Sequence, residues 1–419
     1  MSRALRRVND DGRHTVSWRI DCIFRDEIQG PDLRDPRGGN EGCTEMRSKS
    51  GPGAMHIAYC GPIAEPGKPA RGGYEAANRC LIDDLRLRGV QVIEFPYPVA
   101  LGSTVTKAVA YVLRFVHIGW DLVRTRRHWD LLHLTPLKRG FLYFEALLCL
   151  VARGLGKRVV FDIRAGSFVE LYQERGPIYR AVVDALIRHA GIVALEGKED
   201  LAFTQTRRGG PIVYLPNYVS KLQAPSGARD RSSTPLRLVY LGRIVPEKGI
   251  ELAIDALKTL LGMGLNASLE VIGAGQASYV ATLTERTTDL PVVWTGPLAP
   301  DATRARLADA HVFVFPTRHS GEGHSNALTE AMAEGLVPVC SDHGFNRSVV
   351  ADAGRILPRE ASAADYAEAI ASIWQSGQWP QLSIAAYERV ADNFTGDVVV
   401  SSLIRHYEAK PQRDRVAGL

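Results

Sequence analysis

The sequence lacks any uninterrupted apolar run of the roughly 18 residues that a membrane-spanning helix needs. Its nearest candidate, residues 141–151, is short and carries Glu145. The start of the chain has no apolar segment of the kind that predicts a secretory signal. We therefore expect a cytoplasmic protein, and any contact with a membrane to be peripheral, on its inner face.

The sequence also lacks closely spaced pairs of cysteines. The six cysteines are scattered and none stands in a Cys-x-x-Cys spacing, which argues against a zinc site or a redox pair. Free thiols in a reducing compartment fit this pattern. The net charge of +5 and the pI near 8.8 suit an anionic ligand or an acidic membrane surface, but the excess is too small to indicate nucleic acid as a partner.

The length of 419 residues, with 45% hydrophobic content, predicts two domains, because a single core stops growing near ~250–300 residues. Residues 1–54 are rich in Arg, Asp, Gly and Pro and lack periodicity, so we expect a disordered extension or a misassigned start. Residues 221–235 are polar and rich in Ser and Pro, which is typical of a linker.

Short apolar runs alternate with helical patterns on both sides of this linker. In residues 55–220 the strand-like runs are 56–60, 90–95, 130–134, 158–163, 191–195 and 212–215. In residues 236–390 they are 236–241, 269–272, 292–294, 312–315 and 337–340. Such alternation predicts an α/β fold made of two doubly wound, Rossmann-like domains, each with a parallel sheet.

Ligands of open α/β sheets bind beyond the carboxyl ends of the strands. The run ending at Leu241 is followed by Gly242, Arg243, Lys248 and Gly249. An Arg and a Lys five residues apart on a glycine-hinged loop can converge on a diphosphate. The alternative is a pair of solvated charges on a turn.

The run ending at Phe315 is followed by a loop with Glu322 and then by a helix with Glu330 in its second turn. Ser325 or Asn326 is suited to the N-cap of this helix. The two carboxylates would then lie at different depths of one cleft, where they could accept hydrogen bonds from sugar or ribose hydroxyls. The alternative is a surface helix with ordinary glutamates.

Together these segments resemble the family 4 glycosyltransferases, also called glycosyl transferases group 1. The resemblance rests on Gly242-Arg243 with Lys248-Gly249, and on Glu322-x7-Glu330 followed by Ala-Met-Ala-x-Gly. Gly72-Gly73 resembles the glycine loop of that family. The resemblance covers about residues 55–409 and implies the GT-B fold, in which two Rossmann-like domains face each other across a cleft.

The resemblance implies a role for each matching residue. Arg243, Lys248 and Glu322 would be catalytic: the two cations hold the donor diphosphate and Glu322 binds the transferred sugar. Donor binding would also involve Gly323 and Asn326 near Glu322, Gly242, Glu330 at the ribose, and a loop at Gly72 and Gly73 that closes over the phosphates. Residues 391–409 would form a terminal helix that crosses back to the first domain.

The implied reaction is retaining and needs no cofactor beyond the nucleotide-diphosphate sugar itself. No Asp-x-Asp motif occurs anywhere in the chain, so we expect no metal. The acceptor would be a glycan or a lipid-linked molecule, in polysaccharide or cell-envelope glycan synthesis. Three alternatives remain: a nucleotide-sugar 2-epimerase of the same fold, a non-catalytic nucleotide-sugar-binding subunit, and a phosphorylase-like enzyme, for which no cofactor lysine is evident.

The sequence departs from the family pattern at Arg164, which stands where many members have a histidine facing the sugar. Arg164 could bind phosphate or an acidic sugar as an accessory residue, or pair with an acid at the sheet edge. We expect His133 to be structural. His319 and His324 flank Glu322, but histidines five apart in a loop are more often hydrogen-bonding residues than metal ligands.

A helical stretch over residues 104–129 carries an apolar face and a basic end. The face consists of Val109, Val112, Leu113, Val116 and Trp120, and the end of Arg124, Arg126, Arg127 and His128. We expect the face to pack on the first sheet, since most helices are stabilised in that way. The alternative is a helix that lies on an anionic membrane and delivers a lipid-linked acceptor.

Overall fold

The structure is a computed structural model that describes residues 55–67, 70, 72–97, 104–137, 139–164, 166–221 and 235–409. These residues all belong to one compact unit, Gly51–Leu419. The predicted extension over residues 1–54 and most of the predicted linker lie outside the described residues. The domain boundaries themselves remain predictions.

The first half of this unit contains a six-stranded parallel sheet in the order β2-β1-β3-β4-β5-β6. Its strands are β1 His56–Gly61, β2 Gln91–Pro96, β3 Leu131–Leu134, β4 Arg158–Ile163, β5 Ile192–Leu195 and β6 Ile212–Tyr214. The central strands are buried along nearly their whole length. Their continuous apolar runs are typical of a parallel sheet that is covered on both faces.

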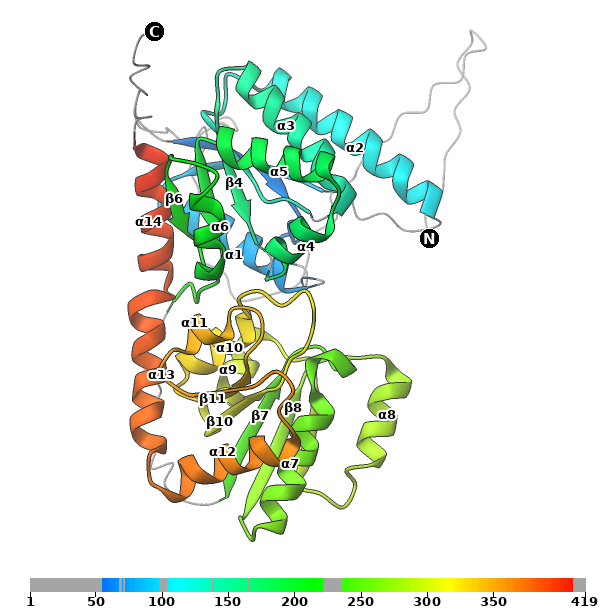
Figure 1. The fold of residues 1–419 in the computed structure, drawn as a ribbon, viewed down its shortest axis with the longest axis vertical. Helices are drawn as coiled ribbons and strands as arrows, with labels where there is room; N and C mark the ends of the chain where they lie inside the picture. The colour runs from blue at the N-terminus through cyan, green and yellow to red at the C-terminus, as the bar shows by residue number, and fades with distance from the viewer. Residues whose placement is uncertain are drawn as a thin grey trace, which may run out of the picture. The chain divides into compact units, whose positions relative to one another are not determined.

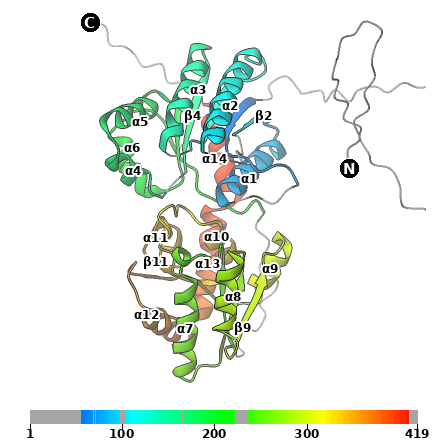
Figure 2. The ribbon, with the colours of Figure 1, turned by 90° about the vertical axis from the view of Figure 1, so that its right-hand side faces the viewer.

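Helices cover both faces of this sheet (Figures 1 and 2). One face packs on α2 Thr104–Arg124, α3 Leu142–Gly154, α4 Phe168–Glu174, α5 Pro177–His189 and α6 Leu201–Gln205. The other face packs on α1 Gly73–Leu87 and on the last helix of the described chain. Two 3-10 turns, η1 Arg139–Phe141 and η2 Lys198–Asp200, precede α3 and α6.

The second half contains another six-stranded parallel sheet, in the order β12-β11-β10-β7-β8-β9. Its strands are β7 Leu236–Leu241, β8 Ala267–Ile272, β9 Val292–Gly296, β10 Val312–Phe315, β11 Val337–Ser341 and β12 Arg355–Leu357. The edge strand β12 is only three residues long and was not predicted. The remaining predicted strands of both sheets end within one or two residues of the observed bounds.

This second sheet is also covered on both faces. One face packs on α7 Ile250–Gly262, α8 Ala277–Glu285 and α12 Ala363–Gln375. The other packs on α9 Pro300–Ala308, α10 Asn326–Ala333, α11 Asn346–Val350 and α13 Trp379–Asn393. The 3-10 turn η3 Pro246–Lys248 lies between β7 and α7. The fold is thus two doubly wound α/β halves, as predicted.

The chain returns to the first half through α14 Gly396–Glu408. The sequence predicted one terminal helix over residues 391–409, but α13 ends at Asn393 and a new helix begins after Thr395. The Thr395 side chain accepts a hydrogen bond from the Val398 amide at 3.4 Å, as an N-cap does. Helix α14 packs on α1 and β6 and adds Val399, Val400, Leu403 and Tyr407 to the core of the first half.

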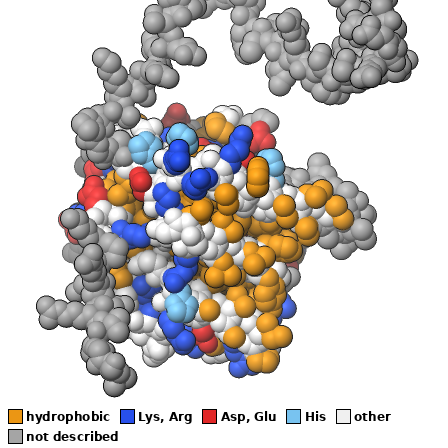
Figure 3. Space-filling view, turned by 90° about the horizontal axis from the view of Figure 1, so that it is seen from above, with side chains coloured by type: hydrophobic (Ala, Val, Ile, Leu, Met, Phe, Trp, Pro, Cys, Tyr) orange, Lys and Arg blue, Asp and Glu red, His pale blue; other side chains and the backbone are white. Residues whose placement is uncertain are grey.

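Helix α2 packs on the first sheet, as predicted, but through a different face. Over residues 109–124 the buried side chains are Phe115, Ile118 and Leu122, whereas the predicted inward face is 41–66% exposed. Helix α3 adds the exposed residues Tyr143, Leu147 and Leu150. Seen from above, hydrophobic side chains form a broad area bordered by Lys and Arg (Figure 3). Across the described residues, no helix combines the length and apolar character needed to cross a membrane.

Candidate functional site

Two loops at the carboxyl ends of β7 and β10 form the centre of the candidate site. The first loop needs glycine at position 249, where φ is +76° and a Cβ would overlap the carbonyl of Pro316 in the second loop. The Arg318 amide also donates to the Glu247 carbonyl at 2.7 Å. These contacts hold the two loops against each other, because only glycine combines a positive φ with such close approach.

The side chains of Lys248 and Glu322 meet between these loops. The Lys248 ammonium donates to Oε2 of Glu322 at 2.5 Å, and the Thr317 hydroxyl donates to the same oxygen at 2.8 Å. Glu322 is 7% exposed. A lysine has three donors and a carboxylate has two oxygens, so this pair can hold further ligands without breaking its own bond.

Arg243 joins this group through His319. Its guanidinium donates to Nε2 of His319 at 3.2 Å, and the Arg243 side chain is otherwise exposed. Burial and the nearby charge of Lys248 hold the pKa of His319 below its usual range. The neutral ring has one acceptor nitrogen, which is shared between Arg243 at Nε2 and the Gly321 amide at Nδ1 according to the tautomer. Arg243, Lys248 and Glu322, which lie far apart in the sequence, are therefore brought together.

Glu330 lies on α10, and no contact with those three side chains is found in the part of the chain that the structure describes. The Glu330 residue is exposed, although the protein atoms crowded around its carboxyl raise the pKa of that group to about 7. Such a shift is common at functional sites but also occurs elsewhere. Glu330 therefore titrates near neutral pH.

The predicted glycine loop and the start of α10 are in contact. The Asn326 side chain donates to the carbonyl of Gly73 at 3.3 Å, and Gly72 precedes α1 with extended backbone. Ser325 takes the N-cap position of α10, but its side chain makes no capping bond. The amide of Asn326 thus links the two halves instead of capping the helix.

Two glycines let neighbouring loops approach the backbone of Glu322, and a third lies against the side chain of Glu196. A Cβ at Gly166, just after β4, would overlap the Glu322 carbonyl oxygen, and one at Gly344 would lie 2.7 Å from it. A Cβ at Gly323 would overlap the carboxylate of Glu196. Gly323 was predicted as a donor-binding residue, and this role remains a prediction.

Arg164 is the centre of a buried polar network. Its Nε donates to Asp162 at 2.7 Å and one terminal nitrogen donates to Asn217 at 3.2 Å. Asp162 also contacts Nε2 of His133 at 3.1 Å, and the Tyr407 hydroxyl lies 2.6 Å from Nδ1 of that ring. Of the two predicted roles for Arg164, the pairing with an acid is the one that this geometry shows.

The charged groups of this network stabilise one another. Burial opposes the charge of Arg164, but the carboxylate of Asp162 outweighs it and raises the pKa of the guanidinium. Burial likewise opposes ionisation of Asp162, but Arg164 and His133 keep its pKa lowered. His133 is fully buried with both ring nitrogens bonded, which fits the predicted structural role.

The two histidines that flank Glu322 have separate environments. His324 is buried, with Nε2 2.7 Å from the Thr329 hydroxyl, and burial lowers its pKa to about 3. Its carbonyl accepts from the Asn217 side chain at 2.6 Å. Within the described ranges no cluster of three or more His, Cys, Asp or Glu could hold a metal ion.

Sequence reasoning missed Thr317, which shares Glu322 with Lys248, and Asn217, which joins Arg164 to the His324 carbonyl. Thr317 directly follows a strand, as site residues often do in such folds, but a lone threonine there carries no specific signal. Asn217 lies in a loop shortly after β6, and a single asparagine there carries no specific signal either.

A cavity of about 850 Å³ borders the Glu322 loop on the side of the first half. The loop contributes His319, Ser320 and Gly321, and the first half contributes four acidic residues, Glu170, Glu174, Glu199 and Asp200, and the aromatic ring of Phe203. Carboxylates beside an aromatic ring suit a hydroxyl-rich ligand, since each carboxylate can accept hydrogen bonds from hydroxyls.

Residues 235–376, in the second half of the chain, match the family described as Glycosyl transferases group 1. This agrees with the motifs at Arg243, Lys248, Glu322 and Glu330, which all fall within the matched range.

Curated proteins are similar to the chain over part of their length. A GDP-mannose-dependent alpha-(1-6)-phosphatidylinositol monomannoside mannosyltransferase of Mycobacterium tuberculosis is 30% identical over 186 residues, covering 38% of this chain and 47% of that protein. The amylovoran biosynthesis glycosyltransferase AmsK of Erwinia amylovora is 29% identical over 121 residues, covering 27% and 30%. The chain spans about half the length, or less, of the curated relatives it matches.

Solved structures are similar over most of the chain. Anabaena Alr3699/HepE, crystallised with UDP, has a TM-score of 0.62 and 16% identity, covering 84% of this chain and 99% of that one. The sucrose-phosphate synthase of Thermosynechococcus elongatus has a TM-score of 0.64 and 18% identity, covering 84% and 98%. At these identities the likeness defines the fold, which is GT-B.

Proposed function

We propose that the protein is a retaining, metal-independent glycosyltransferase that moves a sugar from a nucleoside diphosphate to a glycan or lipid-linked acceptor. The observation that carries the proposal is the convergence of Arg243, Lys248 and Glu322 at the carboxyl ends of β7 and β10. These are the residues that match the family motif, and their charges suit the diphosphate and the sugar of one donor.

The donor would be held by complementary charges. Lys248 keeps two N–H donors beyond the one given to Glu322, and the guanidinium of Arg243 keeps most of its five. Both can therefore bind phosphate oxygens and stabilise the negative charge that develops on the leaving diphosphate. The hydrogen bonds found for Glu322 in the described structure go to Oε2, which leaves Oε1 to accept from sugar hydroxyls.

This arrangement favours attack on the face from which the diphosphate leaves. Glu322 is held by Lys248 and Thr317, so it is suited to orient the sugar and not to form a covalent bond with it. The acceptor oxygen would bond to the anomeric carbon as the bond to the diphosphate breaks, and the acceptor proton would pass to the departing phosphate oxygen. The anomeric configuration would then be retained, with catalysis by positioning and charge stabilisation.

The acceptor would enter through the cavity of about 850 Å³ beside the Glu322 loop. Its carboxylates from α4 and η2 and the ring of Phe203 suit the hydroxyls and apolar faces of a sugar chain. The relatives named after amylovoran biosynthesis and phosphatidylinositol mannoside synthesis support a role in polysaccharide or cell-envelope glycan synthesis.

The exposed apolar stripe of α2 supports peripheral binding of the protein to the inner face of the membrane. Trp120 and Val116 are each 66% exposed, and the helix ends in basic residues that favour anionic lipids. In co-sedimentation with phosphatidylglycerol vesicles, Trp120→Glu should reduce binding about tenfold, whereas Trp374→Phe in the second half should not. Equal binding of wild type and Trp120→Glu would remove the membrane from the proposal.

A panel of UDP-, GDP- and ADP-sugars tests the reaction itself. Release of free nucleotide together with a lengthened acceptor supports a transferase. An isomerised donor would indicate an epimerase, and binding without turnover a non-catalytic subunit; either result overturns the proposal. NMR of the product gives the anomeric configuration, and inversion would contradict the proposed mechanism.

Turnover in the presence of EDTA tests the absence of a metal requirement. Because two cations are placed to offset the diphosphate charge, we expect turnover to be unchanged by chelation. Loss of activity that added magnesium restores would show that a metal supplies this charge instead.

A further inference from the structure

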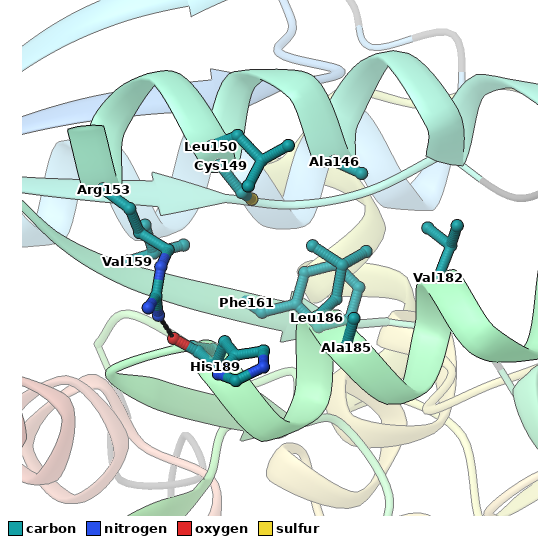
Figure 4. A pocket seen from close by; sticks show the side chains of 11 residues that line it. Ala146, Cys149, Leu150, Arg153, Val159, Phe161, Val182, Ala185, Leu186 and His189 are labelled. Carbon is teal, nitrogen blue, oxygen red and sulfur yellow. Dashed lines mark hydrogen bonds between the residues drawn. The ribbon is translucent and has the colours of Figure 1, made fainter.

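An apolar cavity of about 400 Å³ lies between α3 and α5, on the face of the first sheet that these helices cover. Its buried walls are Cys149, Val159, Phe161, Leu186 and Ala190. In Figure 4 Phe161, Val182 and Leu186 lie in the space between the two helices. This volume falls within the range of small-molecule sites, roughly 300–1,000 Å³, and its lining suits a hydrocarbon chain.

The cavity reaches the surface. Leu150 from α3 is 62% exposed, and Arg153, Ala185 and His189 on its rim are also exposed. The Arg153 side chain donates to the His189 carbonyl (Figure 4), and so bridges the two helices at one end of the opening. A ligand can therefore enter without unfolding either helix.

A second cavity, of about 530 Å³, adjoins the first. The two share Leu150, Arg153, Val159 and His189, and the second adds Lys157 and Arg158. Neither is lined by an acidic side chain. A long apolar space thus continues into a cationic one, as an amphiphilic anion would require.

These cations are held in place by backbone carbonyls. Lys157 donates to the Trp129 carbonyl at 2.5 Å, and Arg158 donates to the carbonyls of Tyr407 and Ala409 at 2.7 and 2.8 Å. No ion pair between an acid and Arg153, Lys157 or Arg158 is found among the described residues. Carbonyl oxygens fix the side chains without cancelling their charge, so the positive potential remains available to an anion.

The position of the cavities separates them from the proposed reaction. Arg158 begins β4 and Arg164 follows its end, and a six-residue strand is roughly 20 Å long at about 3.3 Å per residue. Leu150 also belongs to the exposed stripe of α3 with Tyr143 and Leu147. The opening is thus continuous with the exposed apolar surface and distant from Glu322.

We propose that these two cavities form a binding site for a single anionic phospholipid taken from the membrane. One acyl chain lies between α3 and α5, and the phosphate is bound by Arg153 and Lys157, with Arg158 adding charge. Binding of this lipid would anchor the protein to anionic membranes. This inference does not depend on the glycosyl transfer proposed above.

Binding of monomeric dioctanoyl phosphatidylglycerol, measured by calorimetry below its critical micelle concentration, tests the site. Ala185→Trp places a large ring at the opening and should weaken binding about tenfold or more. The matched control is Ala181→Trp, one turn earlier on the exposed side of α5 and away from the cavity, which should bind like wild type. Arg153→Gln should weaken binding to a similar extent by removing charge.

Two other lipids, zwitterionic phosphatidylcholine and the isoprenoid farnesyl phosphate, test which class of lipid the site binds. Dioctanoyl phosphatidylcholine should bind at least about tenfold more weakly than the anionic lipid, and glycerol 3-phosphate should not compete. Equal affinities of the Ala185→Trp and Ala181→Trp variants, or equal binding of both lipids, would overturn the proposal. Binding of farnesyl phosphate without binding of phosphatidylglycerol would also overturn the proposal, because the site would then bind an isoprenoid phosphate and not a phospholipid.

A measurement on the wild-type protein guards against misfolded variants. The Cys149 thiol lines the cavity, whereas the Cys340 thiol is buried in the second half. Phosphatidylglycerol should slow alkylation of Cys149 several-fold relative to Cys340. Equal slowing of both thiols would mean that the lipid does not occupy the cavity.

Discussion

Nζ of Lys248 lies 2.5 Å from Oε2 of Glu322, although 74 residues separate them in the sequence. The pair is mostly shielded from solvent, with side chains 13% and 7% exposed. Each partner therefore balances the charge of the other at low solvent access, and removing either leaves an uncompensated charge. The same two groups are proposed to bind the donor, so the loss of either should lower turnover as well as stability.

Lys248→Ala and Glu322→Ala should each lower kcat/KM at least ~100-fold, the scale of losing one key electrostatic contact. The double variant should lose much less than the product of the two single losses, since the residues act as a unit. Lys258→Ala is the matched control, because that lysine pairs with Asp255 on an exposed helix face. Wild-type turnover in either single variant would refute the site assignment.

Arg164→Met should destabilise the protein by about 3–5 kcal/mol, the cost of leaving one partner of a buried ion pair uncompensated. Here the unpaired group is Asp162, which is fully buried. Asp162→Asn combined with Arg164→Met should recover part of this loss, as measured by urea unfolding. If Arg164 acts on a substrate instead, the single variant would unfold normally and lose only turnover.

Acid should destabilise the fold through His324. Its pKa is about 3 in the folded protein against about 6.5 when unfolded, so below pH 6.5 the unfolded chain binds more protons. The contribution of His324 to the free energy of unfolding is therefore fully present above pH 6.5. It decreases by about 3 kcal/mol between pH 6.5 and pH 4. His324→Gln should flatten this part of the pH profile of unfolding, and exposed His128→Gln should leave it unchanged.

Donor affinity should rise with pH if Glu330 accepts hydrogen bonds from the ribose. The pKa of its carboxyl is about 7, so the ionised form, which only accepts, becomes populated between pH 6 and 8. Calorimetric titration with the nucleotide sugar found in the donor panel should show a few-fold tighter binding across this range. Glu330→Gln should remove the pH dependence, and an unchanged profile in that variant would exclude the ribose contact.

Much of the fold could be predicted because parallel strands buried on both faces leave continuous apolar runs in the sequence. The short strand β12 left no such run, since three half-buried residues carry little pattern. The face of α2 was misjudged because apolar periodicity shows that a helix has an apolar side and not what covers it. Phe115, Ile118 and Leu122 lie on the same helix and form the side that packs.

The candidate site could be predicted only in part. The spacing of Arg243, Lys248, Glu322 and Glu330 carried a family signal that composition alone would not have given. Contacts such as Thr317 with Glu322, and Asn326 with Gly73, depend on how loops fold back in space. The alternatives open for Arg164 could be separated only by seeing Asp162 beside it, because a sequence does not show which acid faces a given arginine.

The return of the chain through α14 has a practical consequence for dissecting the molecule. A fragment cut near residue 220 would contain every strand of the first sheet and still expose the surface that Val399, Val400, Leu403 and Tyr407 cover. The Tyr407 hydroxyl would also be lost from His133. A soluble version of the first half would therefore need residues 396–409 supplied as a separate peptide or joined by a designed loop.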